Sequence, residues 1–330
     1  MVRERNAGLD LLRFLAAIFV TNSHLDVCYG DYAFLATGGT IGDVLFFFCS
    51  GYTLFMKPVE GGIKSFPNWY KRRFNRIFPS IFAVAMISCI VKDDLSGGGI
   101  FDILTGYDYW FIQCIMLYYV LIYFIGCYFK FNLLYIYALL SLVTLGWFLL
   151  IEKEAGYSMY HPGSLIKWCP YFLFMVMGAQ LGRMRLKITT NGKKSLLGDF
   201  LKSMIGIGLF YIFLAVGVKY EQYSVVQVLS FLPLLYGIYK WYEISQYSQV
   251  ESFVNKYNFV IRFIGGLCLE IYLVGDFIIT DKLNHLFPFN IPILLGGIVI
   301  SAYLLRCLAR FYSQSFKNEP YDWKAMVSLI

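Results

Sequence analysis

Long apolar runs, separated by short polar segments, make up most of the chain. Runs of about 17–25 residues, the length that crosses a bilayer as a helix, lie near residues 7–28, 38–56, 76–92, 108–128, 131–151, 168–184, 201–218, 223–240, 260–280 and 288–310. The third run is short and Pro233 interrupts the eighth, which a membrane helix tolerates when neighbours satisfy the freed carbonyl. The pattern predicts an all-α, polytopic membrane helix bundle of about ten transmembrane helices. We expect one domain over residues 1–330, with no appended soluble domain.

Basic residues are distributed unevenly between alternate loops. With the N-terminus inside, 22 of the 28 lysines and arginines fall on the cytoplasmic side and 5 on the outer side, while Arg13 lies within a span. Cytoplasmic loops of membrane proteins accumulate lysine and arginine. The distribution therefore predicts that both termini are cytoplasmic, N-in and C-in.

The composition agrees with a membrane protein and excludes some other classes. Hydrophobic residues make up 58% of the chain and charged residues 15%, whereas a soluble domain carries about 25% charged residues. The net charge of +7 then reflects the cytoplasmic loops, and we expect no nucleic acid as partner. The eight cysteines are scattered without a CxxC pair, so the sequence predicts neither a disulfide framework nor a metal site.

The first run contains three ionisable residues, Asp10, Arg13 and His24. An ionisable group within a span costs about 2.5–3.5 kcal/mol on insertion scales and marks a functional site by default. Eleven residues at 100° each place Arg13 and His24 on one helix face, about 16 Å apart, and Asp10 lies one turn before Arg13. The spacing predicts a polar stripe along the helix, with the Arg13 guanidinium towards the cytoplasmic side and the His24 imidazole towards the outer side. The alternative is that Arg13 snorkels inward and His24 is an interfacial histidine.

A basic cluster precedes the third run. The segment Trp69–Ser80 reads WYKRRFNRIFPS and is expected to end the cytoplasmic loop that follows the second run. Guanidinium groups bind phosphate oxygens in a bidentate manner, so Arg72, Arg73 and Arg76 are candidates for docking a phosphate-bearing coenzyme. The alternative is an anchor that only follows the positive-inside rule.

Further polar residues are weaker candidates. Glu270 lies within the ninth run and is a candidate for catalytic support, with a structural hydrogen bond to a neighbouring helix as the alternative. Trp110 and Gln113 are spaced to share a helix face and are candidates for an acceptor site, although Trp110 also suits an interfacial anchor. Gly51, in the second run, is expected to allow close helix packing.

Several segments, in this order, resemble the membrane-bound acyltransferase 3 family. The first helix has an arginine, ten residues and a histidine, which Arg13 and His24 match. Four further segments are similar to family motifs: FFFCSGY at Phe46–Tyr52, the arginines and proline of Arg73–Pro79, YWFIQCIMLYYVL at Tyr109–Leu121, and LEIYL at Leu269–Leu273. The chain departs from the late histidine that relatives often have, because Asp276 follows Gly275 at that place, and we expect it to lack the soluble esterase-like domain of some members.

The resemblance implies an activity and a location. It implies an O-acyltransferase, acting as an O-acetyltransferase, that moves an acyl group from acyl-CoA (acetyl-CoA) to a hydroxyl of a surface polysaccharide, a lipopolysaccharide or a lipid-linked sugar. It implies a multi-pass protein among the lipids of the bacterial cytoplasmic membrane, with no permanently bound cofactor. His24 would be the general base, Arg13 would position the thioester or orient the base, and Arg72, Arg73 and Arg76 would hold the phosphates of coenzyme A.

Two other functions fit the same bundle. A transporter or flippase for a lipid-linked sugar would also carry intramembrane charges, but it has no need of the arginine cluster and favours internal repeats, which the sequence lacks. A catalytically inactive scaffold of the same fold is the other alternative, because the late histidine is absent.

Overall fold

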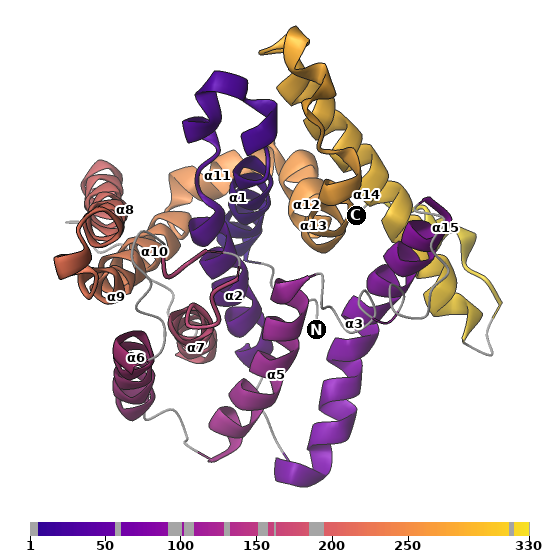
Figure 1. Ribbon diagram of the computed structural model, residues 1–330. Helices are drawn as coiled ribbons and strands as arrows, with labels where there is room; N and C mark the ends of the chain where they lie inside the picture. Colours follow the sequence, from indigo (N-terminus) through magenta and orange to yellow (C-terminus); the bar gives the residue numbers. More distant parts are fainter. Residues whose placement is uncertain are drawn as a thin grey trace. The chain divides into compact units, whose positions relative to one another are not determined.

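A computed structural model describes residues 6–56, 61–91, 101, 109–128, 133–150, 158–161, 163–184, 195–316 and 320–329. These residues are 86% helical and contain no strand, which confirms the all-α prediction. The chain divides into two compact units. Figure 1 labels the helices of both.

Unit 1 comprises Met1–Leu12, Asp43–Val59 and Phe124–Asn258. It holds the start of α1 (Ala7–Ser23) and most of α2 (Gly39–Phe55). The other helices are α6 (Leu133–Leu150), α7 (Trp168–Met184), α8 (Leu196–Lys219), α9 (Val226–Leu229), α10 (Phe231–Ser245) and α11 (Ser248–Lys256). Helix α7 is buried along almost its whole length, so it forms the core of this unit.

Unit 2 comprises Arg13–Gly42, Glu60–Tyr123 and Phe259–Ile330. It holds the rest of α1, the short 3-10 helices η1 (Asp26–Cys28), η2 (Gly30–Leu35) and η4 (Asp281–Leu286), and the α-helices α3 (Gly62–Val91), α5 (Trp110–Tyr128, through Tyr123), α12 (Asn258–Gly266, from Phe259), α13 (Cys268–Ile278), α14 (Asn290–Ser315) and α15 (Trp323–Met326). Helices α3, α13 and α14 pack against one another.

Close backbone contact between α2 and α7 depends on glycine. A side-chain Cβ on Gly51 would collide with the carbonyl oxygen of Met175, and one on Gly178 would collide with that of Phe48. Glycines at helix interfaces let two backbones approach closely in a membrane. The packing role expected for Gly51 is therefore confirmed.

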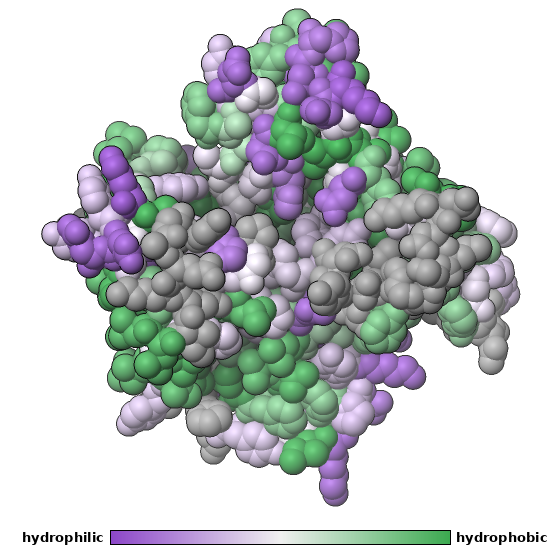
Figure 2. Space-filling view, in the orientation of Figure 1, coloured by the Kyte–Doolittle hydropathy of each residue, from purple (hydrophilic) through white to green (hydrophobic). Residues whose placement is uncertain are grey.

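Five stretches in the described part of the chain are long and apolar enough to cross a membrane. They are Gly30–Phe55, Gly62–Val91, Trp110–Tyr128, Leu196–Lys219 and Asn290–Ser315. A shorter apolar helix covers Leu134–Leu150, and its exposed side chains include Leu134, Leu139, Leu142 and Leu150. Apolar side chains cover this outward face of α6 in Figure 2, as expected of a surface in contact with lipid. The count of ten spans and the orientation stay predictions, and residues 92, 108, 131–132 and 151 of the predicted runs lie outside the described residues.

Several predicted boundaries were wrong. The first run does not continue to residue 28, because α1 ends at Ser23. The run 223–240 is divided between η3 (Glu221–Tyr223), α9 and α10, and the run 260–280 breaks at Leu267 between α12 and α13. Pro233 does not cause the break in the eighth run, since it lies in the first turn of α10, where a missing backbone N–H is tolerated.

Candidate functional site

His24 lies immediately beyond the last residue of α1. The final turn is tightened, because the His24 amide donates to the Thr21 carbonyl at 3.1 Å and the Ser23 hydroxyl donates to the Val20 carbonyl at 2.8 Å. The His24 side chain is exposed. The imidazole at this place is therefore accessible at the end of the helix.

Tyr272 forms the centre of an aromatic cluster beside His24. Its ring centroid lies 6.4 Å from that of His24, 5.7 Å from that of Tyr109 and 5.8 Å from that of Phe111. The Tyr109 hydroxyl donates to the Leu273 carbonyl at 3.4 Å. Three segments far apart in the sequence therefore meet around the Tyr272 ring: the end of α1, the start of α5 and the middle of α13.

Arg13 is half-buried in the middle of α1, next to the start of α13. The Cys268 thiol lies 3.6 Å from the Arg13 carbonyl oxygen, while Tyr272, one turn later on α13, contacts His24. Helix α13 thus contacts α1 both beside Arg13 and beside His24. The arginine and the histidine are connected through α13 rather than by direct contact.

Both carboxylate oxygens of Glu270 are engaged by neighbouring helices. Ser80 on α3 donates to Glu270 Oε1 at 2.9 Å, and Arg306 on α14 donates to Oε2 at 2.9 Å. Arg306 also donates to the carbonyl of Gly266. The structural hydrogen bond that the sequence left open for Glu270 is present, since its side chain joins α3, α13 and α14.

The basic cluster is not on a loop, which corrects the expectation from sequence. Helix α3 begins at Gly62 and includes all three arginines. Arg73 lies over the Trp69 ring, 4.8 Å from its centroid, a distance typical of a cation–π contact. Arg72 and Arg76 are exposed, so the cluster presents two accessible guanidinium groups and one that is stacked on an aromatic ring.

Helix α5 lies beside the arginine-bearing part of α3 (Figure 1). The Trp69 ring packs against Tyr119 and Tyr123 of α5, with centroids 6.2 and 4.9 Å apart. Further along the helix pair is a cavity of about 160 Å³, lined by Phe74, Ile77, Phe78 and Ile81 of α3 and by Ile112, Gln113 and Met116 of α5. Along α3 the arginines therefore lie between Trp69, which packs against Tyr123, and the residues that line this cavity.

The remaining predicted residues lie as follows. Gln113 lines the cavity, whereas Trp110 is half-buried at the start of α5. Asp10 lies in the first turn of α1, where a carboxylate interacts favourably with the helix dipole. Asp276 is exposed one turn after Tyr272 on α13, so it shares the helix face that carries the aromatic cluster.

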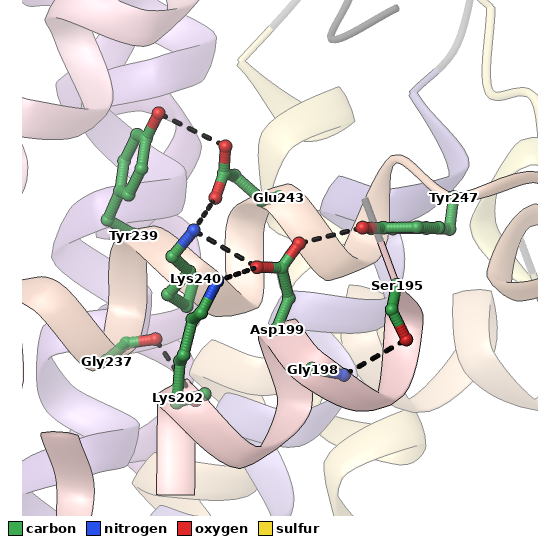
Figure 3. A network of polar contacts seen from close by, with 10 residues as sticks. Ser195, Gly198, Asp199, Lys202, Gly237, Tyr239, Lys240, Glu243 and Tyr247 are labelled. Carbon is green, nitrogen blue, oxygen red and sulfur yellow. Dashed lines mark hydrogen bonds and ion pairs between the residues drawn. The ribbon is translucent and has the colours of Figure 1, made fainter. Parts of the chain in front are cut away.

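A second polar cluster lies within unit 1, between α8 and α10 (Figure 3). Asp199 accepts from Lys240 at 3.2 Å and from Tyr247 at 2.7 Å, and Lys202 lies 3.6 Å from the same carboxylate. Glu243 accepts from Lys240 and from Tyr239 at 3.4 Å. Burial and the hydrogen bond to Asp199 raise the pKa of Tyr247 to about 12, so this hydroxyl stays protonated and keeps donating. With two carboxylates and two ammonium groups, the cluster is balanced in charge and joins the two helices.

Sequence reasoning missed ionisable residues in these contacts, and two of them are Arg306 and Asp43. Arg306 lies inside the predicted run 288–310 and Asp43 inside the run 38–56. Asp43 accepts from the Tyr171 hydroxyl at 3.4 Å. The rule that selected Arg13 and Glu270, an ionisable group within a span, would have selected both residues. Tyr272 carried a weaker signal, because only its place in the LEIYL segment set it apart.

Comparison with known proteins identifies one relationship. A family model described as an acyltransferase domain matches residues 6–309. No curated protein matches the chain, and no solved structure matches it.

Proposed function

Because the chain belongs to the acyltransferase 3 family, whose model covers residues 6–309, we propose that this membrane acyltransferase moves an acetyl group from acetyl-CoA to a hydroxyl of a carbohydrate acceptor. The acceptor would be a surface polysaccharide, a lipopolysaccharide or a lipid-linked sugar in the bacterial cytoplasmic membrane. The observation that carries the proposal is the place of His24. It is an exposed imidazole beside Tyr272, where three of the family-like segments meet.

The proposed reaction is a direct transfer. The acceptor oxygen bonds to the thioester carbonyl carbon, and the bond from that carbon to sulfur breaks. The acceptor proton passes to His24, which then returns a proton to the departing thiolate of coenzyme A. A general base at this step contributes about 10²–10⁴-fold to the rate, because a neutral hydroxyl is a weak nucleophile.

The arginines would bind the donor. Arg72, Arg73 and Arg76 lie on one helix, and guanidinium groups bind phosphate oxygens with charge-assisted hydrogen bonds. Arg13 lies beside Cys268 of α13, one turn before Tyr272, and would position the thioester or orient the base. Glu270 would act indirectly. Its contacts with Arg306 and Ser80 fix the position of α13, and α13 carries Tyr272.

Heat protection of the purified protein by acetyl-CoA tests the proposal. A ligand that binds only the folded state stabilises it by RT ln(1 + [L]/Kd), about 2.7 kcal/mol at a hundredfold excess over Kd. We expect acetyl-CoA to raise the melting temperature, together with a gain of one acetyl mass on glycans of cells that carry the intact gene. Absence of both effects would instead favour a flippase or an inactive scaffold.

A further inference from the structure

We propose that the cavity between α3 and α5 holds the arm of the acyl donor next to its sulfur, with Gln113 hydrogen-bonded to the amide of that arm. The inference rests on the proposed function and names a donor subsite within it. It also reassigns Gln113, which the sequence analysis placed with the acceptor, to the donor.

The lining of the cavity fits a chain of methylene groups interrupted by an amide. Six of its seven side chains are apolar or aromatic, and Gln113 supplies the one amide. Ligand sites are typically apolar with a few polar groups that fix orientation. A glutamine side chain can donate and accept hydrogen bonds at once, which is what a secondary amide in the ligand requires.

The size of the cavity limits what it can hold. Its volume is about 160 Å³, and an apolar cavity of about 150 Å³ accommodates a molecule of the size of benzene. A segment of about six heavy atoms therefore fits. This is the size of a cysteamine unit with its amide, and it is too small for a whole pantetheine arm.

The cavity also lies next to a cation on the same helix. Ile77, in the lining, follows Arg73 by four residues, which is one helical turn. Arg72 lies nine residues before Ile81, so the two point in opposite directions at 100° per residue. Arg76 follows Phe74 by two residues and points 200° away from it, so Arg73 is the arginine best placed for the phosphates of a donor whose arm enters the cavity.

The face of α5 that lines the cavity continues, one turn earlier, to Tyr109 of the aromatic cluster. Tyr109, Ile112, Gln113 and Met116 follow the spacing of a single face of α5, and Tyr109 packs against Tyr272, which contacts His24. The donor would then follow one continuous path. Its phosphates would bind at Arg73, the cysteamine unit of its arm would lie in the cavity, and its thioester would lie near Tyr109. A lipid tail in the same cavity would need neither the amide of Gln113 nor the neighbouring arginine.

Two donors of different length separate these possibilities. Acetyl-CoA carries the phosphates and the whole arm, while S-acetyl-N-acetylcysteamine carries only the thioester, two methylene groups and one amide. KM for each would be measured with the full-length protein in membranes. For Gln113→Leu we expect KM to rise roughly fivefold for both donors, since one hydrogen bond is lost. For Arg73→Gln we expect KM to rise for acetyl-CoA and to stay unchanged for the short donor.

A variant that fills the cavity gives an independent measurement. Ile81→Trp should raise KM for both donors at least tenfold, whereas Ile90→Trp, the same change at an exposed place on α3, should alter neither. If the Gln113→Leu and Ile81→Trp variants both keep the wild-type KM for the two donors, the donor subsite is overturned and a lipid tail is left as the occupant of the cavity. The proposed function would survive that result, and would fail only if the wild type transferred acetyl from neither donor.

Discussion

Glu270 and Arg306 form an ion pair within unit 2, with Oε2 and Nη2 2.9 Å apart. Their side chains are 9% and 15% exposed. The pair joins α13 to α14, and Ser80 adds α3 through the second carboxylate oxygen. Removing one partner of a buried pair costs about 3–5 kcal/mol, because the other charge is left uncompensated.

Separate loss of either partner should therefore destabilise the protein. We expect Arg306→Met and Glu270→Leu each to lower the free energy of unfolding by about 3 kcal/mol, measured by thermal unfolding in detergent. The double variant should be more stable than either single variant, since no uncompensated charge is left. If the double variant regains stability but not acyl transfer, the Glu270–Arg306 pair takes part in transfer in addition to its structural role.

Replacement of His24 should remove activity without unfolding the protein. His24 is exposed, and surface substitutions generally change stability by less than about 0.5 kcal/mol. We expect His24→Ala to reduce acyl transfer by about 10²–10⁴-fold, the contribution of a general base, with an unchanged melting temperature. His285, which is exposed in η4, provides the matched control, and His285→Ala should retain full activity. Full activity of His24→Ala at normal abundance would exclude the base.

How far the sequence predicts this structure depends on the kind of feature. Hydrophobic runs located most helices, because crossing a bilayer requires an apolar segment of similar length in each of them. They failed where a helix breaks inside a continuous apolar run, as at Leu267, since hydropathy does not record the local backbone geometry. They also failed at Gly62, where α3 begins in a polar segment that was expected to be a loop.

The candidate site was partly accessible from the sequence for a related reason. His24 and Glu270 were found because ionisable groups are rare in spans. Their partners Tyr272 and Ser80 are ordinary residues for a membrane helix, and only the fold brings them to the imidazole and the carboxylate. The cavity at Gln113 depends on the packing of two helices, which no spacing within one segment specifies.

The close contact of α2 and α7 should make Gly51 intolerant of any side chain. A Cβ at this place would collide with the Met175 carbonyl oxygen, so Gly51→Ala must displace one backbone. We expect a loss of about 1–3 kcal/mol, the usual cost of overpacking a core. On α6, Gly146 has open space around its Cα, and Gly146→Ala should be neutral or stabilising because alanine favours the helix. Thermal unfolding of both variants checks the difference, and an equal response would contradict the close packing.

Lys240 and Lys202 both approach Asp199, but their surroundings predict different effects. Lys240 is 13% exposed and contacts two carboxylates, while Lys202 is 57% exposed. Lys240→Met leaves Asp199 and Glu243 close together without their shared cation, so we expect a loss of about 3 kcal/mol or more in the free energy of unfolding. Lys202→Met removes only an exposed pair, whose contribution is about 0–1 kcal/mol.

Both variants replace a lysine of the same cluster with methionine. The difference between their losses in free energy of unfolding therefore measures the effect of burial and shared contacts rather than of charge alone. Thermal unfolding at low and high salt separates the contribution of the buried ion pairs from that of the exposed pair, since salt screens exposed pairs far more than buried ones. The Lys240→Met loss should persist at high salt, whereas any loss in Lys202→Met should disappear. Equal, salt-sensitive losses would mean that the cluster is open to solvent and does not join α8 to α10.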